Sequence, residues 1–105
     1  QNAALLALTG DIISAEQAKE MGLVTILTET GSALDGALEI AEKIAANGPL
    51  AVRATKEVLA ASARYTDAEF MAWQQTVVGP VFASEDAREG ATAFAEKRAP
   101  QWKSR

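Results

Sequence analysis

The sequence predicts a mainly α-helical fold. Alanine fills 23 of the 105 positions, two capping-box patterns mark helix starts, and apolar residues recur with helical spacing. The hydrophobic fraction of 49% is too high for a disordered tail. A chain of this length forms one small domain or a piece of one, with a thin core. Because it starts at Gln1 in helix-like sequence, we expect this start to lie inside a longer polypeptide.

The first part of the chain carries a helix signal followed by a strand signal. Ser14 and Gln17 have the spacing of a capping box, which predicts a short helix that Gly22 ends. The apolar run Leu23–Leu27 then predicts a short buried strand. The polar loop 28–31 follows, and we expect a domain boundary there, with one part at 1–31 and another at 32–105.

The next segment predicts two helices joined at a Gly-Pro pair. Gly48-Pro49 ends the first helix, which Ser32 starts, and begins the second, because proline suits a first helical position. One stripe of the first helix is apolar and is predicted to face the core: Leu34, Ala37, Leu38, Ala41, Ile44 and Ala45. The packing face of the second helix is mostly small: Ala51, Ala54, Val58 and Ala61.

A further helix is predicted after residue 65. Thr66 and Glu69 form a capping box, and Tyr65 with Phe70 has the spacing of a hydrophobic staple. This helix is predicted to bury Phe70, Trp73 and Val77. A kink or break is predicted at Pro80, which lacks the N–H that a helix interior requires.

The last helix has charges suited to its dipole. Ser84 can cap its start, Glu85-Asp86 places negative charge on the first turn, Lys97-Arg98 places positive charge on the last, and Pro100 is predicted to stop it. The two adjacent acids point about 100° apart on a helix, so capping explains them better than acid/base catalysis. One side is almost flat, which favours close approach of another helix in this subunit or a neighbour: Ala87, Gly90, Ala91 and Ala95.

Composition argues against several classes of partner and site. The net charge of −4, with acids and bases interleaved, does not suit a nucleic-acid backbone. No apolar run approaches the roughly 20 residues that span a bilayer, so we expect no membrane partner. Without His or Cys the segment holds no Ser-His-Asp triad, Cys nucleophile or usual zinc site, and we expect no metal. The lack of cysteine also suits a reducing compartment, and we expect a cytoplasmic protein.

Two segments together resemble a known family. Leu8–Val24 has the pattern L-T-G-x-x-I-S-A-x-x-A-x-x-x-G-L-V, and Ser84–Pro100 has S-E-D-x-x-E-G-x-x-A-F-x-E-K-R-x-P. Both resemble the enoyl-CoA hydratase/isomerase, or crotonase, superfamily, although the resemblance is weak over 64–79. It implies that residues 1–31 end the spiral α/β core domain. Residues 32–105 would then be the C-terminal helical domain, which in that family builds trimers and covers an active site.

The resemblance also implies an activity for the full-length protein. Such enzymes bind an acyl-CoA thioester, polarise its carbonyl with two backbone N–H groups and move protons with carboxylates. The commonest member, an enoyl-CoA hydratase of fatty-acid β-oxidation, adds water to 2-enoyl-CoA. Those groups lie in the N-terminal part of the family fold, so no catalytic residue is expected here. An isomerase, another acyl-CoA enzyme, a CoA-binding relative without activity and a non-catalytic helical assembly module remain alternatives.

Phe94 and Lys97 are the predicted binding residues. They match the family's terminal Phe and Lys, which lie near the adenosine end of coenzyme A, often across a subunit boundary. A phenyl ring can stack on a purine, and an ammonium three residues along, on nearly the same helix face, can reach a phosphate. Alternatively, Phe94 anchors the core and Lys97 is a solvated dipole partner. The resemblance implies no permanently bound cofactor, coenzyme A only as part of the substrate, and a homo-oligomer, either a trimer or a dimer of trimers.

Overall fold

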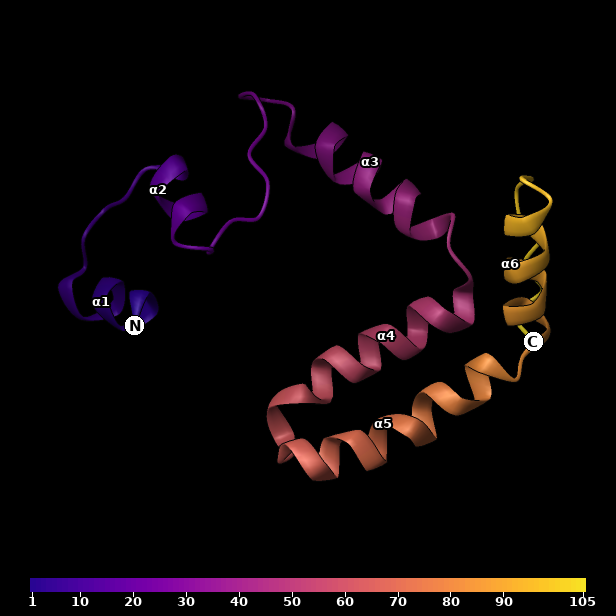
Figure 1. Cartoon of the computed structure of the whole chain (residues 1–105). Helices are drawn as coiled ribbons and strands as arrows, with labels where there is room; N and C mark the ends of the chain where they lie inside the picture. Colours follow the sequence, from indigo (N-terminus) through magenta and orange to yellow (C-terminus); the bar gives the residue numbers. More distant parts are fainter. The chain divides into compact units, whose positions relative to one another are not determined.

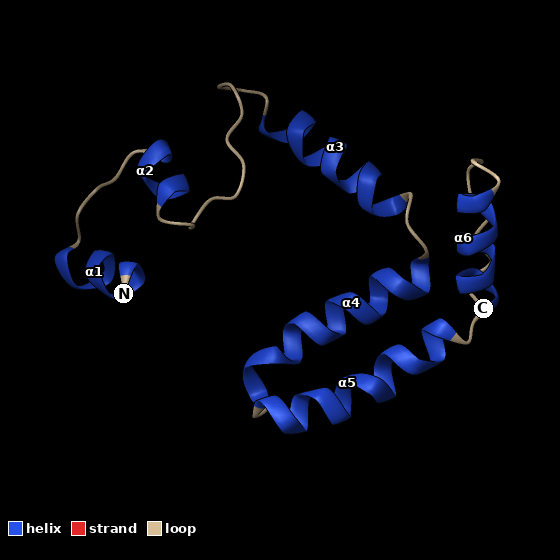
Figure 2. Cartoon of the chain, in the orientation of Figure 1, coloured by secondary structure: helices blue, strands red, loops and turns tan.

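The computed structural model describes all 105 residues and contains helices and loops but no strand (Figure 1 and Figure 2). The helices are α1 (Asn2–Thr9), α2 (Ala15–Glu20), α3 (Ala33–Ala45), α4 (Pro49–Ala61), the 3-10 turn η1 (Ser62–Arg64), α5 (Asp67–Phe82) and α6 (Glu85–Ala95). This confirms the mainly helical prediction. None of these helices combines the length and the apolar character that crossing a membrane requires.

The chain separates into two compact units, residues 1–40 and 41–105. The predicted division after residue 31 concerns the domains of the family fold and stays a prediction. Each unit is described on its own below.

In the first unit, α2 begins and ends as the sequence predicts. The Ser14 hydroxyl accepts a hydrogen bond from the Gln17 backbone N–H at 3.2 Å, and the Gln17 side chain accepts one from the Ser14 N–H at 2.9 Å. Gly22 adopts a φ of 79°, and the next N–H, that of Leu23, donates to the Ala18 carbonyl at 2.8 Å. This left-handed glycine ends the helix in a Schellman motif, where a side chain would be strained.

The predicted strand at Leu23–Leu27 is wrong, because these residues form a loop. A strand is stabilised by hydrogen bonds to a neighbouring strand, and no segment of this chain supplies one. Leu23 and Ile26 remain 53% and 54% exposed, so the apolar run is not buried either.

Helix α3 forms where its apolar periodicity predicts, but its stripe is not buried. Leu34, Leu38 and Ile44 remain 69%, 51% and 49% exposed, and no residue of the helix is buried. The prediction that this stripe faces a core is therefore wrong for this chain. The amphipathic pattern determines which face is apolar, whereas burial requires another element to cover that face.

Helices α4 and α5 lie side by side, joined through η1 (Figure 1). Helix α4 starts at Pro49 with Gly48 as its N-cap, as predicted. Ala54 and Ala61 are buried, at 8% and 7% exposure, which confirms two positions of the small packing face. Ala51, on the same predicted face, is exposed.

The start of α5 is capped as predicted and carries an aromatic cluster. The Glu69 carboxylate accepts hydrogen bonds from the Thr66 N–H at 3.0 Å and its hydroxyl at 2.7 Å. Tyr65 stacks on Trp73, with ring centroids 5.2 Å apart, and Phe70 lies 6.0 Å from the same ring. The side chains that were predicted to be buried here are only half-buried: Phe70, Trp73 and Val77.

The predicted break at Pro80 is absent. Helix α5 continues through Pro80 to Phe82, and the N–H of Ala83 donates to the Gly79 carbonyl at 3.2 Å. Because Pro80 lies only two residues before the helix ends, the hydrogen bond that it cannot make is lost in the last turn, where few bonds remain to be disrupted.

Helix α6 starts as predicted but ends early. The Ser84 hydroxyl caps its start by accepting from the Ala87 N–H at 3.0 Å. The helix ends at Ala95, before Lys97 and Arg98, so these two residues do not form its last turn and Pro100 does not stop it. Its end is instead fixed by the loop geometry described below.

Candidate functional site

The two predicted binding residues lie at the end of α6 but not on one helix face. Phe94 belongs to the last turn and its side chain is 86% exposed, so it is not a core anchor in this unit. Lys97 lies beyond the helix with a φ of 54°. The prediction that both side chains share nearly the same helix face is therefore wrong, because the helix ends at Ala95 and the backbone of Lys97 is left-handed.

Lys97 occupies a position where glycine is usual. Its N–H donates to the Phe94 carbonyl at 3.2 Å, and the Arg98 N–H donates to the Ala93 carbonyl at 3.0 Å. These two bonds form a Schellman motif with Lys97 as the left-handed residue. The left-handed conformation costs a side chain about 1–2 kcal/mol, and such strain is concentrated at functional sites.

The chain beyond α6 folds back along the helix (Figure 1). Residues 96–105 form this segment, which we call the C-terminal strap. The Asp86 carboxylate accepts hydrogen bonds from the backbone N–H groups of Lys103 at 2.7 Å and Ser104 at 3.0 Å. The Asp86 N–H donates to the Arg105 carbonyl at 3.1 Å, and the Asp86 residue is only 4% exposed. Asp86 therefore anchors the strap, a role that the sequence interpretation missed when it assigned this acid to capping and the helix dipole.

A second acid of α6 holds the near end of the strap. The Glu89 carboxylate accepts hydrogen bonds from the Arg98 guanidinium at 2.5 and 3.1 Å and from the Gln101 N–H at 2.8 Å. These bonds, led by those from Arg98, lower the pKa of Glu89 from 4.5 to about 2. The Arg98 Nε also donates to Glu96 at 2.6 Å, and the bonds to Glu89 and Glu96 raise the pKa of Arg98.

Trp102 docks the strap against neighbouring backbone. Its indole Nε1 donates to the Ala46 carbonyl at 2.9 Å, which satisfies a carbonyl at the end of α3. The ring lies over two glycines, and a Cβ added at Gly90 would be 3.2 Å from it, or 3.6 Å if added at Gly48. Part of the predicted flat side of α6 is therefore covered by this chain's own tryptophan.

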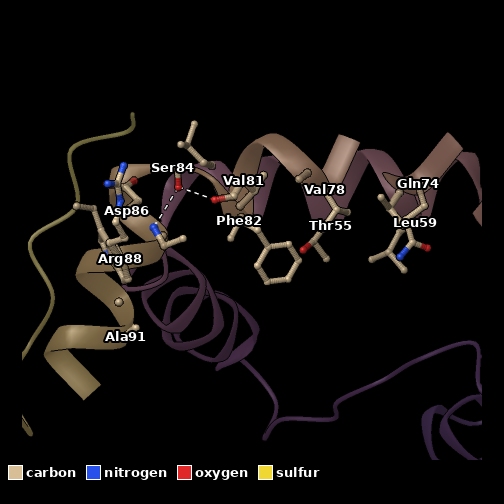
Figure 3. Close-up of a pocket in the computed structure, with 18 residues that line it drawn as sticks. Thr55, Leu59, Gln74, Val78, Val81, Phe82, Ser84, Asp86, Arg88 and Ala91 are labelled. Atoms are coloured by element: carbon tan, nitrogen blue, oxygen red, sulfur yellow. Dashed lines mark hydrogen bonds between the residues drawn. The ribbon is translucent and has the colours of Figure 1, made fainter. Parts of the chain in front are cut away.

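A mostly apolar groove of about 780 Å³ lies between α4, α5 and α6 (Figure 3). Thr55, Val78 and Phe82 are among the residues that line it. Its one acidic side chain, Asp86, holds the strap, and Ser84 donates to the Val81 carbonyl at 2.6 Å; the other polar residues of the lining are Thr55, Gln74 and Arg88. The groove therefore offers shape and apolar surface but no free acid/base pair.

Comparison with known proteins gives the same family over the whole chain. Residues 1–105 match the sequence model described as enoyl-CoA hydratase/isomerase. The chain is 45% identical over 100 residues to enoyl-CoA hydratase EchA19 of Mycobacterium tuberculosis, and this match covers 95% of this chain and 38% of that protein. It is 38% identical over 98 residues to the mitochondrial enoyl-CoA hydratase of Pongo abelii, and this match covers 93% of this chain and 34% of that protein.

A solved structure of an enoyl-CoA hydratase from Mycobacterium tuberculosis agrees with the fold. Its TM-score is 0.93 at 52% identity, over 98% of this chain and 41% of that one. The chain thus spans between 34% and 41% of the length of these relatives and corresponds to their C-terminal helical part. These matches confirm the resemblance inferred from the two sequence patterns, and the chain belongs to the enoyl-CoA hydratase/isomerase family.

Proposed function

We propose that the full-length protein containing this chain is an enoyl-CoA hydratase, which adds water to the double bond of 2-enoyl-CoA thioesters. The observation that carries the proposal is the match of the whole chain to relatives named enoyl-CoA hydratase. The groups that polarise the thioester and move protons belong to residues outside this chain. Assaying the full-length protein with crotonyl-CoA tests the proposal, and a lack of hydration would contradict it.

An enoyl-CoA isomerase is the second candidate, because the family model covers isomerases as well as hydratases. The two reactions differ in a simple observable. A hydratase consumes the 2-enoyl chromophore and incorporates oxygen from water, whereas an isomerase moves the double bond and leaves the mass of the ester unchanged. Mass spectrometry of the product in ¹⁸O-labelled water therefore separates them.

The proposed contribution of this chain is to bind the adenosine end of coenzyme A through Phe94 and Lys97. Phe94 offers an exposed ring for the adenine. Lys97 makes none of the ion pairs in the structure, whereas the adjacent Arg98 makes two. An exposed ammonium without a carboxylate partner is available to a phosphate. The strained backbone of Lys97 supports a functional reason for this residue, since glycine would relieve the strain.

This site is tested by replacing Lys97 in the full-length enzyme. We expect Lys97→Ala to raise KM for an acyl-CoA at low salt and to leave kcat almost unchanged, because the adenosine end is held equally in the ground and transition states. An acyl-pantetheine, which lacks the adenosine and its phosphates, should not respond. Lys43→Ala, which removes an exposed charge from α3, is the matched control. An unchanged KM for the acyl-CoA would refute the assignment of Lys97.

The assembly, location and cofactor content of the full-length protein are also proposals. A homo-oligomer, either a trimer or a dimer of trimers, is supported by the apolar stripe of α3 and by Phe82, which is 78% exposed. Sedimentation as a monomer at micromolar concentration would contradict it. We place the enzyme in the cytoplasm and expect no permanently bound cofactor, with coenzyme A present only as part of the substrate. Dialysed enzyme should accordingly be fully active on addition of substrate alone.

A further inference from the structure

Lys97 is followed by Arg98, whose side chain occupies two acids, Glu89 and Glu96. The guanidinium of Arg98 contacts Glu89 through both terminal nitrogens and Glu96 through Nε. These carboxylates are therefore engaged with Arg98 and not with the ammonium of Lys97, which makes no ion pair. A fork-shaped guanidinium satisfies carboxylates in this way, whereas an ammonium is a point charge. The arrangement leaves one of the two adjacent cations uncompensated.

The backbone of Lys97 is fixed on its C-terminal side through Glu89. The Glu89 carboxylate accepts three hydrogen bonds, two from the Arg98 side chain and one from the Gln101 N–H. It thus ties the residues that follow Lys97 to the side of α6. A left-handed residue other than glycine persists only where the surrounding structure over-determines it. Among the side chains of α6, Glu89 makes the contacts nearest to that turn.

We propose that Glu89 is a positioning residue for the coenzyme A site: through Arg98 and Gln101 it holds Lys97 in the left-handed conformation, with its charge free for a phosphate of the acyl-CoA. This inference rests on the proposed role of Lys97. Glu89 itself does not touch the substrate, and its carboxylate, as a like charge, would repel a phosphate. Its benefit to binding is therefore indirect and must come from geometry.

The test uses Glu89→Gln in the full-length enzyme at low salt. We expect KM for an acyl-CoA to rise about threefold to tenfold, the lower part of the range for coupled neighbours, with kcat unchanged. KM for the acyl-pantetheine should not change. In a Lys97→Ala background, Glu89→Gln should have no further effect. Glu85→Gln is the matched control, because Glu85 is also an acid of α6 that forms ion pairs with the strap, at Lys103 and Arg105 near its end. This variant makes the same charge change and should leave KM unchanged.

The outcomes separate a failure of the positioning role of Glu89 from a failure of the binding role of Lys97. If Lys97→Ala raises KM and Glu89→Gln leaves it unchanged or lowers it, the carboxylate acts only as a like charge and the positioning role is overturned. A Glu89→Gln effect that persists in the Lys97→Ala background, or extends to the acyl-pantetheine, also overturns it. If Lys97→Ala itself leaves KM unchanged, the coenzyme A site and the inference fall together. Should Glu89→Gln fold poorly, Arg98→Lys keeps the charge, loses the two-pronged contact, and is expected to raise KM likewise.

Discussion

Replacing Lys97 with glycine should stabilise the protein while weakening its proposed substrate binding. The φ of 54° costs a residue with a Cβ about 1–2 kcal/mol, and glycine adopts it freely. Glycine also gives the unfolded chain more freedom, which offsets about 0.4–1 kcal/mol of that gain. The net stabilisation should therefore be up to about 1.5 kcal/mol, and each kcal/mol raises Tm by about 2–4 °C in a domain of 150–250 residues.

The measurement is thermal unfolding of the full-length protein, followed by circular dichroism, with two companion variants. Ala95→Gly places glycine inside the last turn of α6, where no strain is relieved, and should lower stability by up to about 1 kcal/mol. Lys97→Ala removes the charge but keeps the strain, so its Tm should not rise. Both Lys97 variants should raise KM for the acyl-CoA. A lower Tm for Lys97→Gly would refute the argument from left-handed strain.

Three further predictions follow from the strap and the composition of the chain. Trp102→Ala removes the indole bond to Ala46 and the ring contact with Gly90, and should lower the free energy of unfolding by about 2 kcal/mol, measured by denaturant titration. The pKa of Glu89 falls from 4.5 in the unfolded chain to about 2 in the folded chain, so its ionised carboxylate stabilises the folded state fully above pH 4.5. This stabilisation is lost as the pH falls towards 2, and Glu89→Gln should remove the corresponding decrease in Tm, measured against pH. Residues 1–105 alone should not hydrate crotonyl-CoA, and measurable turnover would contradict the placement of the catalytic groups outside the chain.

The features that sequence predicted correctly have causes within a few residues. The capping box at Ser14, the glycine stop at Gly22 and the Gly48-Pro49 boundary each depend on three or four neighbouring positions. The strand predicted at Leu23–Leu27 failed because pairing depends on a distant partner. The break at Pro80 failed because the cost of proline depends on its distance from the helix end, which was not known in advance.

The site was predicted only where a family pattern marked it. Phe94 and Lys97 were predicted through the resemblance, and their binding role stays a prediction, whereas the strap and its contacts with Asp86 and Glu89 were missed. Asp86 binds backbone N–H groups 17 and 18 residues away, and Glu89 binds partners 9 and 12 residues away. These separations follow no helical or strand period, and a backbone N–H has no signature in the sequence. A helix-dipole explanation accounted for Asp86 locally and gave no reason to look further.

The strap has its own source of order, distinct from hydrophobic burial. The buried apolar residues of the chain are three alanines, Ala54, Ala61 and Ala93, and no large side chain is fully buried. Such a core offsets little of the conformational entropy of folding, so we expect α3 to α5 to gain stability by covering their apolar faces within the full-length assembly. Besides the contacts of Trp102 with Ala46 and Gly48, the strap is held by hydrogen bonds to Asp86 and Glu89, all within residues 84–105. The left-handed turn at Lys97 should therefore persist whichever surface covers the helices, and this makes it suitable for presenting a charge at the proposed coenzyme A site.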